Sequence, residues 1–270
     1  MTVERPERFL EEDIGYGDIT TDLLVPDVDG TADITCEHAA VVAGAEEAIA
    51  LFEEYGAECE LHAADGERVK KGTKVITVSG PLRNIITIER TALNIMMRMS
   101  GIATAAAGVL ADCRTVNKNI RIAGTRKTAP GLRALDKKAL ALGGCDPHRY
   151  CLDDMILVKD NHIKAAGGMK NAVALLMNAP VTKKVEIEVE NISDALAAAA
   201  AADIIMIDNA SPAEAEKIAN AVREIKNAVI EVSGNITPEN AKDYAKFADV
   251  ISMGCLTHSV RAVHFSMNVR

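Results

Sequence analysis

The chain has 270 residues, 49% of them hydrophobic and 26% charged, a composition that excludes a disordered or fibrous protein. Its 30 lysines and arginines against 39 aspartates and glutamates give a formal charge of −9, which argues against nucleic acid or an anionic membrane surface as a partner. Six scattered cysteines without a CxxC pair, and a charged N-terminus without an apolar signal segment, predict a reduced protein located in the cytoplasm.

The first hundred residues mix short alternating strands with glycine turns. Strands are predicted over residues 31–36, 58–62 and 74–78, and a helix over residues 45–55. Residues 89–110, rich in Ala, Leu, Ile and Met, predict one or two helices joined at Ser100-Gly101. We therefore expect a small α/β domain over residues 1–104, joined by the C-terminal tail 258–270.

A repeating unit begins near residue 120, in which a short aliphatic run is followed by a polar or glycine cluster and then an alanine-rich helical stretch. The runs are residues 120–125, 155–159, 184–188, 204–208, 228–233 and 250–254. This spacing predicts βα units in a parallel sheet over residues 105–257, either closed as an α/β barrel or open and doubly wound. Unusual residues at the ends of all six runs favour the barrel, because a barrel brings those ends to one mouth.

The predicted mouth divides chemically into three sets. The cations are Arg126, Lys127, His148, Arg149 and Lys159; the carboxylates are Glu188 and Asp208; the turns that offer backbone N–H groups are Ser233-Gly234-Asn235 and Gly254-Cys255. A cationic cluster on an acidic protein indicates an anionic ligand, and two carboxylates beside it suit sugar hydroxyls, a divalent cation or a developing positive charge. The pattern predicts a phosphorylated sugar, a second polyanion and Mg²⁺.

Simpler interpretations stay open for individual residues. Glu188 fits the polar face of an edge strand, and Asp208 fits the N-cap of the helix that follows it. The turns at Ser233-Gly234 and at Gly254 fit plain βα connections. Cys145, His148 and Cys151 have a spacing that zinc can use, and Lys159 is placed like the Schiff-base lysine of a barrel aldolase.

Several of these segments carry a family resemblance. They are GTRKTAPGLR at 124–133, GG at 143–144, HR at 148–149, KDNH at 159–162, EDIGYGDIT at 12–20, ERTALN at 89–94, SGIAT at 100–104, VEIEVE at 185–190, IDN at 207–209 and GCLTHS at 254–259. In this order the chain resembles the quinolinate phosphoribosyltransferases, from about residue 9 to the C-terminus. The resemblance implies an N-terminal open α/β sandwich followed by an incomplete α/β barrel, and dimers in which the sandwich of one subunit covers the barrel mouth of the other.

The reaction that the resemblance implies joins quinolinate to 5-phosphoribosyl 1-diphosphate with Mg²⁺ and releases diphosphate and CO₂. By the same resemblance the residues that line the quinolinate site are Arg126, His148, Arg149 and Lys159, with Arg90 entering from the partner subunit. Thr125 is also a substrate-binding residue, and Lys127 serves substrate and phosphate groups. Glu188 and Asp208 hold ribose hydroxyls or Mg²⁺, and residues 233–235 and Met253 to Cys255 grip the 5′-phosphate. Lys127, Glu188 and Asp208 are thus the implied catalytic residues.

Two positions depart from the family pattern. Asn235 replaces a glycine in the phosphate loop, although asparagine tolerates left-handed backbone. His264 replaces an aspartate in a segment predicted to lie outside the pocket. Two other functions remain: a relative acting on a different aromatic acid, such as the homologues associated with molybdenum transport, and a non-catalytic sensor of phosphorylated sugars. The full cationic set argues against the first, and the retained carboxylates argue against the second.

Overall fold

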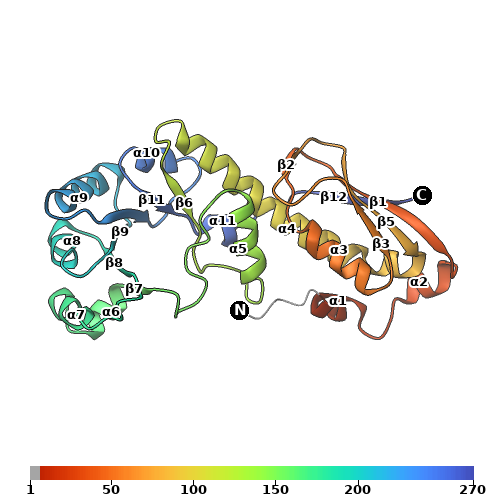
Figure 1. The fold of residues 1–270 in the computed structure, drawn as a ribbon, viewed down its shortest axis with the longest axis horizontal. Coiled ribbons are helices and arrows are strands. Elements are labelled where there is room, and N and C mark those ends of the chain that lie inside the picture. Colours follow the sequence, from red (N-terminus) through yellow and green to blue (C-terminus); the bar gives the residue numbers. More distant parts are fainter. Residues whose placement is uncertain (1–6) are drawn as a thin grey trace. The chain divides into compact units, whose positions relative to one another are not determined.

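The computed structural model describes residues 7–270, which form two compact units (Figure 1). The first unit contains residues 7–107, Pro130–Gly144 and Ser259–Arg270, and the second contains Gly108–Ala129 and Cys145–His258. The predicted barrel domain, 105–257, included residues 130–144, and the structure differs from the prediction there because this segment packs into the first unit.

The first unit is built on a four-stranded antiparallel sheet in the order β12 (Phe265–Val269), β1 (Asp29–Cys36), β5 (Thr73–Pro81) and β3 (Glu58–Leu61). The other elements before residue 82 are α1 (Glu7–Ile14), α2 (Ile19–Leu24), α3 (Ala45–Glu54), and the short pair β2 (Ala40–Val41) and β4 (Arg68–Val69). Alternate residues of β1, namely Ala32, Ile34 and Cys36, are fully buried. The C-terminal tail thus adds a strand to the N-terminal sheet.

Helix α4 (Leu82–Arg114) runs without a break through Ser100-Gly101, so the segment predicted as one or two helices is one helix. A side chain at Gly101 would collide with the carbonyl oxygen of Arg261, and the Ser100 hydroxyl bonds to the backbone of Ala43. Among residues 7–270, α4 is the one helix long and apolar enough to cross a membrane by length and composition. Two thirds of its most apolar window is buried inside the protein, as expected of a core helix.

Helix α5 (Arg133–Leu142) explains why residues 130–144 belong to the first unit. Its buried Asp136 accepts two hydrogen bonds of 2.8 Å from the Arg98 guanidinium on α4. Lys138 donates to Glu47 on α3 at 2.8 Å. After the helix, Gly143 lies so close to α4 that an added Cβ would be 2.6 Å from the carbonyl oxygen of Ala103. These contacts join segments far apart in sequence, which a local pattern does not reveal.

The second unit is a parallel six-stranded sheet in the order β6-β11-β10-β9-β8-β7. The strands are β6 (Arg121–Ala123), β7 (Ile156–Val158), β8 (Val185–Val189), β9 (Ile204–Asp208), β10 (Val229–Ser233) and β11 (Val250–Ser252). The helices after them are α6 (Asp160–Ala165), α7 (Met169–Leu176), α8 (Ile192–Ala198), α9 (Pro212–Ile225), α10 (Ala241–Ala245) and α11 (Cys255–His258). All six strands form within or beside the predicted runs.

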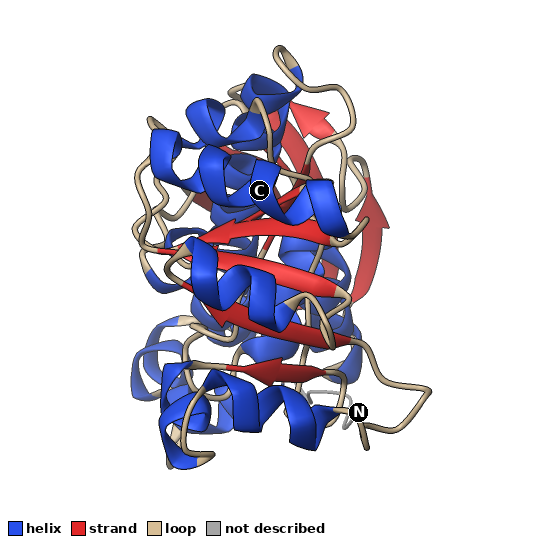
Figure 2. Cartoon of the chain, turned by 90° about the vertical axis from the view of Figure 1, so that its left-hand side faces the viewer, coloured by secondary structure: helices blue, strands red, loops and turns tan. Residues whose placement is uncertain are grey.

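The strand order confirms an incomplete α/β barrel rather than a doubly wound sheet. Neighbours follow the chain order, and the ring of strand pairs is open between β6 and β7, where Asp146 adds an isolated parallel bridge to Ala123. Helices α6 to α10 contact one another in sequence and lie against one face of the sheet (Figure 2). Apolar side chains such as Ile187, Ile205 and Ile230 belong to the helix-covered face, and the residues between them belong to the other, inner face.

Candidate functional site

The inner face of the parallel sheet is unusually polar. By register and alternation it carries Leu157 and Lys159, Glu186 and Glu188, Met206 and Asp208, Glu231 and Ser233, and Ser252. Buried carboxylates are unfavourable without partners, so a face of this composition indicates that cations, hydrogen bonds or a ligand compensate them. All predicted site residues except Arg90 belong to this unit, and the contacts below show which of them meet.

Lys159, Glu188 and Asp208 lie close together at the carboxyl ends of three neighbouring strands. The Lys159 ammonium forms an ion pair with Glu188, whose side chain is only 11% exposed. Burial and the negative charge of Glu188 raise the pKa of the Asp208 carboxyl, while Lys159 and Lys127 act in the opposite sense. Lys127 follows β6, so residues from opposite parts of the open ring face one another. The inner face therefore forms one site rather than a row of separate strand ends.

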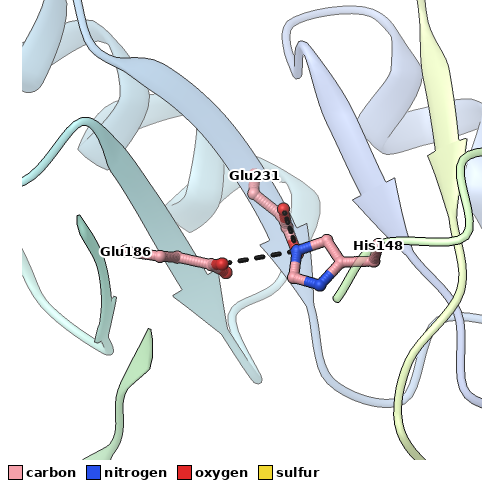
Figure 3. A group of neighbouring side chains, drawn as sticks. All are labelled: His148, Glu186 and Glu231. Carbon is pink, nitrogen blue, oxygen red and sulfur yellow. Dashed lines mark ion pairs between the residues drawn. The ribbon is translucent and has the colours of Figure 1, made fainter. Parts of the chain in front are cut away.

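His148 lies on two buried glutamates, as Figure 3 shows. Its Nε2 is 3.3 Å from Oε2 of Glu186 on β8 and 3.4 Å from Oε2 of Glu231 on β10. Both glutamates are at most 1% exposed, and Glu231 also accepts a hydrogen bond from the Ser252 hydroxyl on β11. Burial alone would lower the pKa of His148, but the two carboxylates raise it to about 10.

Two arginines flank this histidine. Burial and the charge of Arg126 lower the pKa of Arg149, whereas Glu186 and Asp154 raise it, so these charges act on one another within the site. The chain leading to them is anchored by Asp146, whose side chain accepts the His148 N–H at 2.7 Å and pairs with Arg121 on β6. Together with His148, the arginines provide a cationic surface suited to carboxylates.

The loop after β10 is held against the end of β9. Gly234 has a φ of +83°, and an added Cβ would lie 2.5 Å from the Asn209 nitrogen and 2.7 Å from Oδ1 of Asp208. Asn235 adopts a φ of +51° and donates to the Asn209 side chain at 3.0 Å, and Asn209 donates to Asp208 at 2.6 Å. The left-handed conformation expected of Asn235 is confirmed. Among residues 7–270, the non-glycine positions with positive φ are His148, Asn209 and Asn235, and all three are in this site.

The segment after β6 meets the turn after β11. The Thr125 hydroxyl accepts the Lys127 N–H at 3.0 Å, and the Lys127 carbonyl accepts the buried Thr257 hydroxyl at 2.8 Å. At Gly254 an added Cβ would be 2.9 Å from Cδ of Lys127. Met253 is fully buried, and the Cys255 thiol lies within 3.5 Å of the Ile236 carbonyl oxygen. Of the two turns predicted to hold a phosphate, the one at 233–235 is thereby fixed beside Asp208 and the one at 254–255 beside Lys127.

Several simpler interpretations are now excluded. Glu188 is not on an edge strand, since β8 lies between β7 and β9. Asp208 is not the N-cap of α9, because Ser211 accepts from the Glu214 N–H in that role. The cluster of three potential metal ligands found among residues 7–270 is His148, Glu186 and Glu231, so the predicted zinc alternative with Cys145 and Cys151 is not formed.

Two crevices adjoin the carboxylates. One of about 470 Å³ is bordered by Asp208, Asn209 and Glu190, and one of about 220 Å³ by Glu188, Asp160 and Lys164. A further cavity of about 330 Å³ lies entirely within the first unit and includes none of the predicted site residues. In the first unit, Arg90 has a side chain that is 58% exposed, and its ion pair with Glu89 is long, at 3.9 Å.

Sequence reasoning overlooked Glu186, Glu231 and Asn209. Glu186 had a readable signal, because the alternation of residues 185–190 puts it on the same face as Glu188. Glu231 likewise precedes Ser233 by two residues on its strand. Their shared partner is not visible in the sequence, since a glutamate in an apolar run meets its partner only in three dimensions.

The fold and the site define a class of protein: an incomplete α/β barrel whose inner face places arginine, lysine and histidine beside a pair of carboxylates. Residues 102–268 match the family described as "Quinolinate phosphoribosyl transferase, C-terminal domain", and residues 18–100 match the N-terminal domain of the same family. The chain belongs to the quinolinate phosphoribosyl transferase family.

Relatives cover nearly the whole chain. It is 42% identical to a probable nicotinate-nucleotide pyrophosphorylase (carboxylating) of Methanocaldococcus jannaschii, over 97% of this chain and 95% of that protein. The corresponding enzyme of Homo sapiens is 37% identical over 85% of this chain and 78% of the human protein. The crystal structure of NadC from Streptococcus pyogenes has a TM-score of 0.91 and 32% identity, covering 98% of this chain and 96% of that one.

Proposed function

We propose that this protein transfers the phosphoribosyl group of 5-phosphoribosyl 1-diphosphate to quinolinate, with decarboxylation, as a nicotinate-nucleotide pyrophosphorylase of NAD biosynthesis. The products are nicotinate mononucleotide, diphosphate and CO₂. The observation that carries the proposal is the meeting of Lys127, Lys159 and the arginine–histidine cluster with Glu188 and Asp208 on one inner face. The names of the relatives agree with this activity.

Quinolinate carries two adjacent carboxylates, and the site has several cationic side chains to bind them. Arg126 and Arg149 give planar, bidentate contacts, and Lys159 gives a point charge. His148 adds a fourth donor. Because burial weakens screening by water, these contacts fix the pyridine nitrogen in one orientation toward the ribose. Positioning of this kind brings much of the rate enhancement in a two-substrate reaction.

The transfer step forms a bond between the pyridine nitrogen and C1 of the ribose, while the bond from C1 to the diphosphate oxygen breaks and the electron pair leaves with diphosphate. Positive charge develops on the sugar during this step. Glu188 and Asp208, which lie at adjacent strand ends, stabilise that charge and accept hydrogen bonds from ribose hydroxyls. Lys127 neutralises the departing phosphate oxygens.

Decarboxylation follows from the charge on the ring. Once the nitrogen is quaternary, the bond from C2 to its carboxylate breaks, CO₂ leaves, and the electron pair remains on C2 until a proton replaces it. The positive nitrogen next to C2 stabilises this carbanion. The protein therefore only has to hold the substrate in place, through Arg126, Arg149 and His148. The backbone amides of residues 233–235 and 253–255 are proposed to hold the 5′-phosphate.

Mg²⁺ is the proposed cofactor, and the residues fit it. Mg²⁺ prefers oxygen ligands and is usually bound by one or two carboxylates together with substrate phosphates and water. Glu188 and Asp208 supply such a pair, close enough for each charge to act on the other. When bound, the ion would neutralise charge on the diphosphate.

We further propose a homodimer in which Arg90 of each subunit completes the site of the other, as its exposed side chain and weak pairing allow. A cytoplasmic location is proposed because all six cysteines are free thiols.

The purified protein, given quinolinate, phosphoribosyl diphosphate and Mg²⁺, is expected to release CO₂ and form nicotinate mononucleotide. Nicotinic acid should not replace quinolinate, because it offers the arginines one carboxylate instead of two. Release of ¹⁴CO₂ from labelled quinolinate and chromatography of the nucleotide measure both results. Equal or faster turnover of nicotinic acid would overturn the substrate assignment.

Asp208→Asn is expected to lower kcat by about a hundredfold or more, because it removes a charge that faces the reacting sugar. The Mg²⁺ concentration for half-maximal rate should rise, while the affinity for quinolinate stays within about twofold of wild type. Initial rates against MgCl₂ and calorimetric titration with quinolinate measure these effects. Asp243→Asn, on the exposed surface of α10, is the control and should match wild type. An unchanged Mg²⁺ dependence in Asp208→Asn would exclude this carboxylate from the metal site.

A further inference from the structure

The pair of glutamates beneath His148 has no role in the reaction described so far. Glu186 and Glu231 come from strands separated by β9, are at most 1% exposed, and direct their carboxylates at the same ring nitrogen (Figure 3). Two buried carboxylates at one point are strongly unfavourable unless cations compensate them. Two buried carboxylates that face one histidine inside the site therefore indicate a role for that histidine's charge.

Charge balance indicates what compensates them. Burial and the charge of Glu231 raise the pKa of Glu186, while His148 and Arg149 act in the opposite sense. The cations that keep both carboxylates ionised are therefore the His148 ring, which contacts both, and the Arg149 guanidinium, which acts on Glu186. The other groups that act here are Ser252, which donates to Glu231, Asp146, which holds the His148 backbone, and Arg126, whose charge acts on Arg149. With a neutral His148, one of the two buried carboxylates would have to take up a proton.

The two ring nitrogens of His148 differ in their surroundings. Nε2 is buried and lies 3.3–3.4 Å from the two glutamates, in contact as an ion pair rather than a well-aligned hydrogen bond. Among the described residues 7–270, no hydrogen bond to Nδ1 is found either. The ring is 12% exposed, and the backbone is held in a left-handed conformation with a φ of +56° by the bond to Asp146. A neutral imidazole with its proton on Nε2 would present a lone pair at Nδ1 and repel a carboxylate. An imidazolium presents an N–H there instead.

We propose that Glu186 and Glu231 are positioning residues that hold His148 as an imidazolium, so that its Nδ1–H is always available to a carboxylate of the substrate. This role rests on the proposed function of the site. Each glutamate acts through His148 and does not contact the reactants. The raised pKa of about 10 for His148 agrees with it, because the ring then keeps its charge through the neutral range. Binding of a dicarboxylate becomes independent of pH in that range.

The wild-type protein gives the first test, without substrate or variant. In ¹⁵N-histidine NMR spectra of the full chain, both ring nitrogens of His148 should remain protonated at pH 8.5, where an ordinary histidine with a pKa of about 6.5 is neutral. His148→Asn assigns the signal. A neutral ring at pH 8.5 would overturn the proposal. Because the spectrum needs no turnover, it separates a failure of this proposal from a failure of the proposed function.

The second test uses the isosteric variants Glu186→Gln and Glu231→Gln, with Glu224→Gln on the exposed surface of α9 as the control. Each buried variant should weaken quinolinate binding about tenfold at pH 8, with less loss at pH 6, while kcat at saturating quinolinate stays within about threefold of wild type. Calorimetric titration across pH 6–9 measures the profile, and circular dichroism confirms folding.

A third variant covers the case in which a buried glutamine prevents folding. Ser252→Ala removes only the hydroxyl that donates to Glu231, and it should shift the pH at which His148 titrates without loss of structure. Folded variants with the wild-type pH profile would contradict the proposal. So would a shift of the His148 nitrogen signals on addition of Zn²⁺ or Mn²⁺ alone, since the cluster would then be a metal site.

Discussion

Arg90→Ala and Lys127→Ala proteins are each expected to lose at least about 99% of activity, and mixing them under conditions of subunit exchange is expected to restore up to about a quarter of the wild-type rate. The fraction follows from geometry: half of the randomly formed dimers are mixed, and one of the two sites in a mixed dimer contains both side chains. Arg90 is free to reach a neighbouring subunit because its side chain is largely exposed and its pair with Glu89 is long.

The matched control mixes Lys127→Ala with Lys159→Ala. Both residues belong to the second unit and face the same carboxylate, Asp208, so each site of a mixed dimer lacks one of them and no activity should return. The measurement is the rate of CO₂ release after exchange, with exchange confirmed by mass spectrometry of differently labelled subunits. Exchanged but inactive mixtures of Arg90→Ala and Lys127→Ala would show that Arg90 does not act in the partner's site.

Gly234→Ala is expected to lower kcat/KM by about a hundredfold and the free energy of unfolding by about 1–3 kcal/mol. Its methyl group would lie 2.5 Å from the Asn209 nitrogen and 2.7 Å from the Asp208 carboxylate, so the end of β9 must shift. The shift displaces a proposed catalytic carboxylate and breaks the chain of hydrogen bonds from Asn235 through Asn209 to Asp208. Steady-state kinetics and urea denaturation measure the two effects.

Gly72→Ala separates backbone strain from collision. Gly72 has nearly the same positive φ, +81°, but an added methyl group there meets nothing within 4 Å. This variant should show a loss of about 1 kcal/mol in stability from left-handed backbone and no change in kcat/KM. Equal activity in Gly234→Ala and Gly72→Ala would mean that the loop after β10 does not position Asp208.

Features that depend on residues close together in the sequence were predictable. The six strands of the barrel arise from short aliphatic runs, and the polar residue at the end of each run marks the mouth, so Lys159, Glu188 and Asp208 were identifiable as neighbours. The left-handed Asn235 was predictable as well, because few other side chains tolerate that backbone.

Features that depend on distant contacts were not predictable. Ser100-Gly101 has the composition of a helix break, but Gly101 is there because the backbone of Arg261 approaches it, and α4 continues. Residues 130–144 lie between two barrel strands in sequence, yet the pairing of Asp136 with Arg98 draws them into the other unit. The glutamates beneath His148 were hidden for the same reason, since neither strand alone indicates a shared partner.

The division of the chain has a consequence for how the protein can be taken apart. The polypeptide passes between the two units at 107/108, 129/130, 144/145 and 258/259. As a result α5 and β12, which follow residue 108 in the sequence, belong to the first unit. No single truncation releases an intact half: a fragment ending at residue 107 lacks an edge strand of its own sheet, and one starting at 108 carries two segments with nothing to pack on. Heat or urea should therefore melt both halves in one cooperative transition.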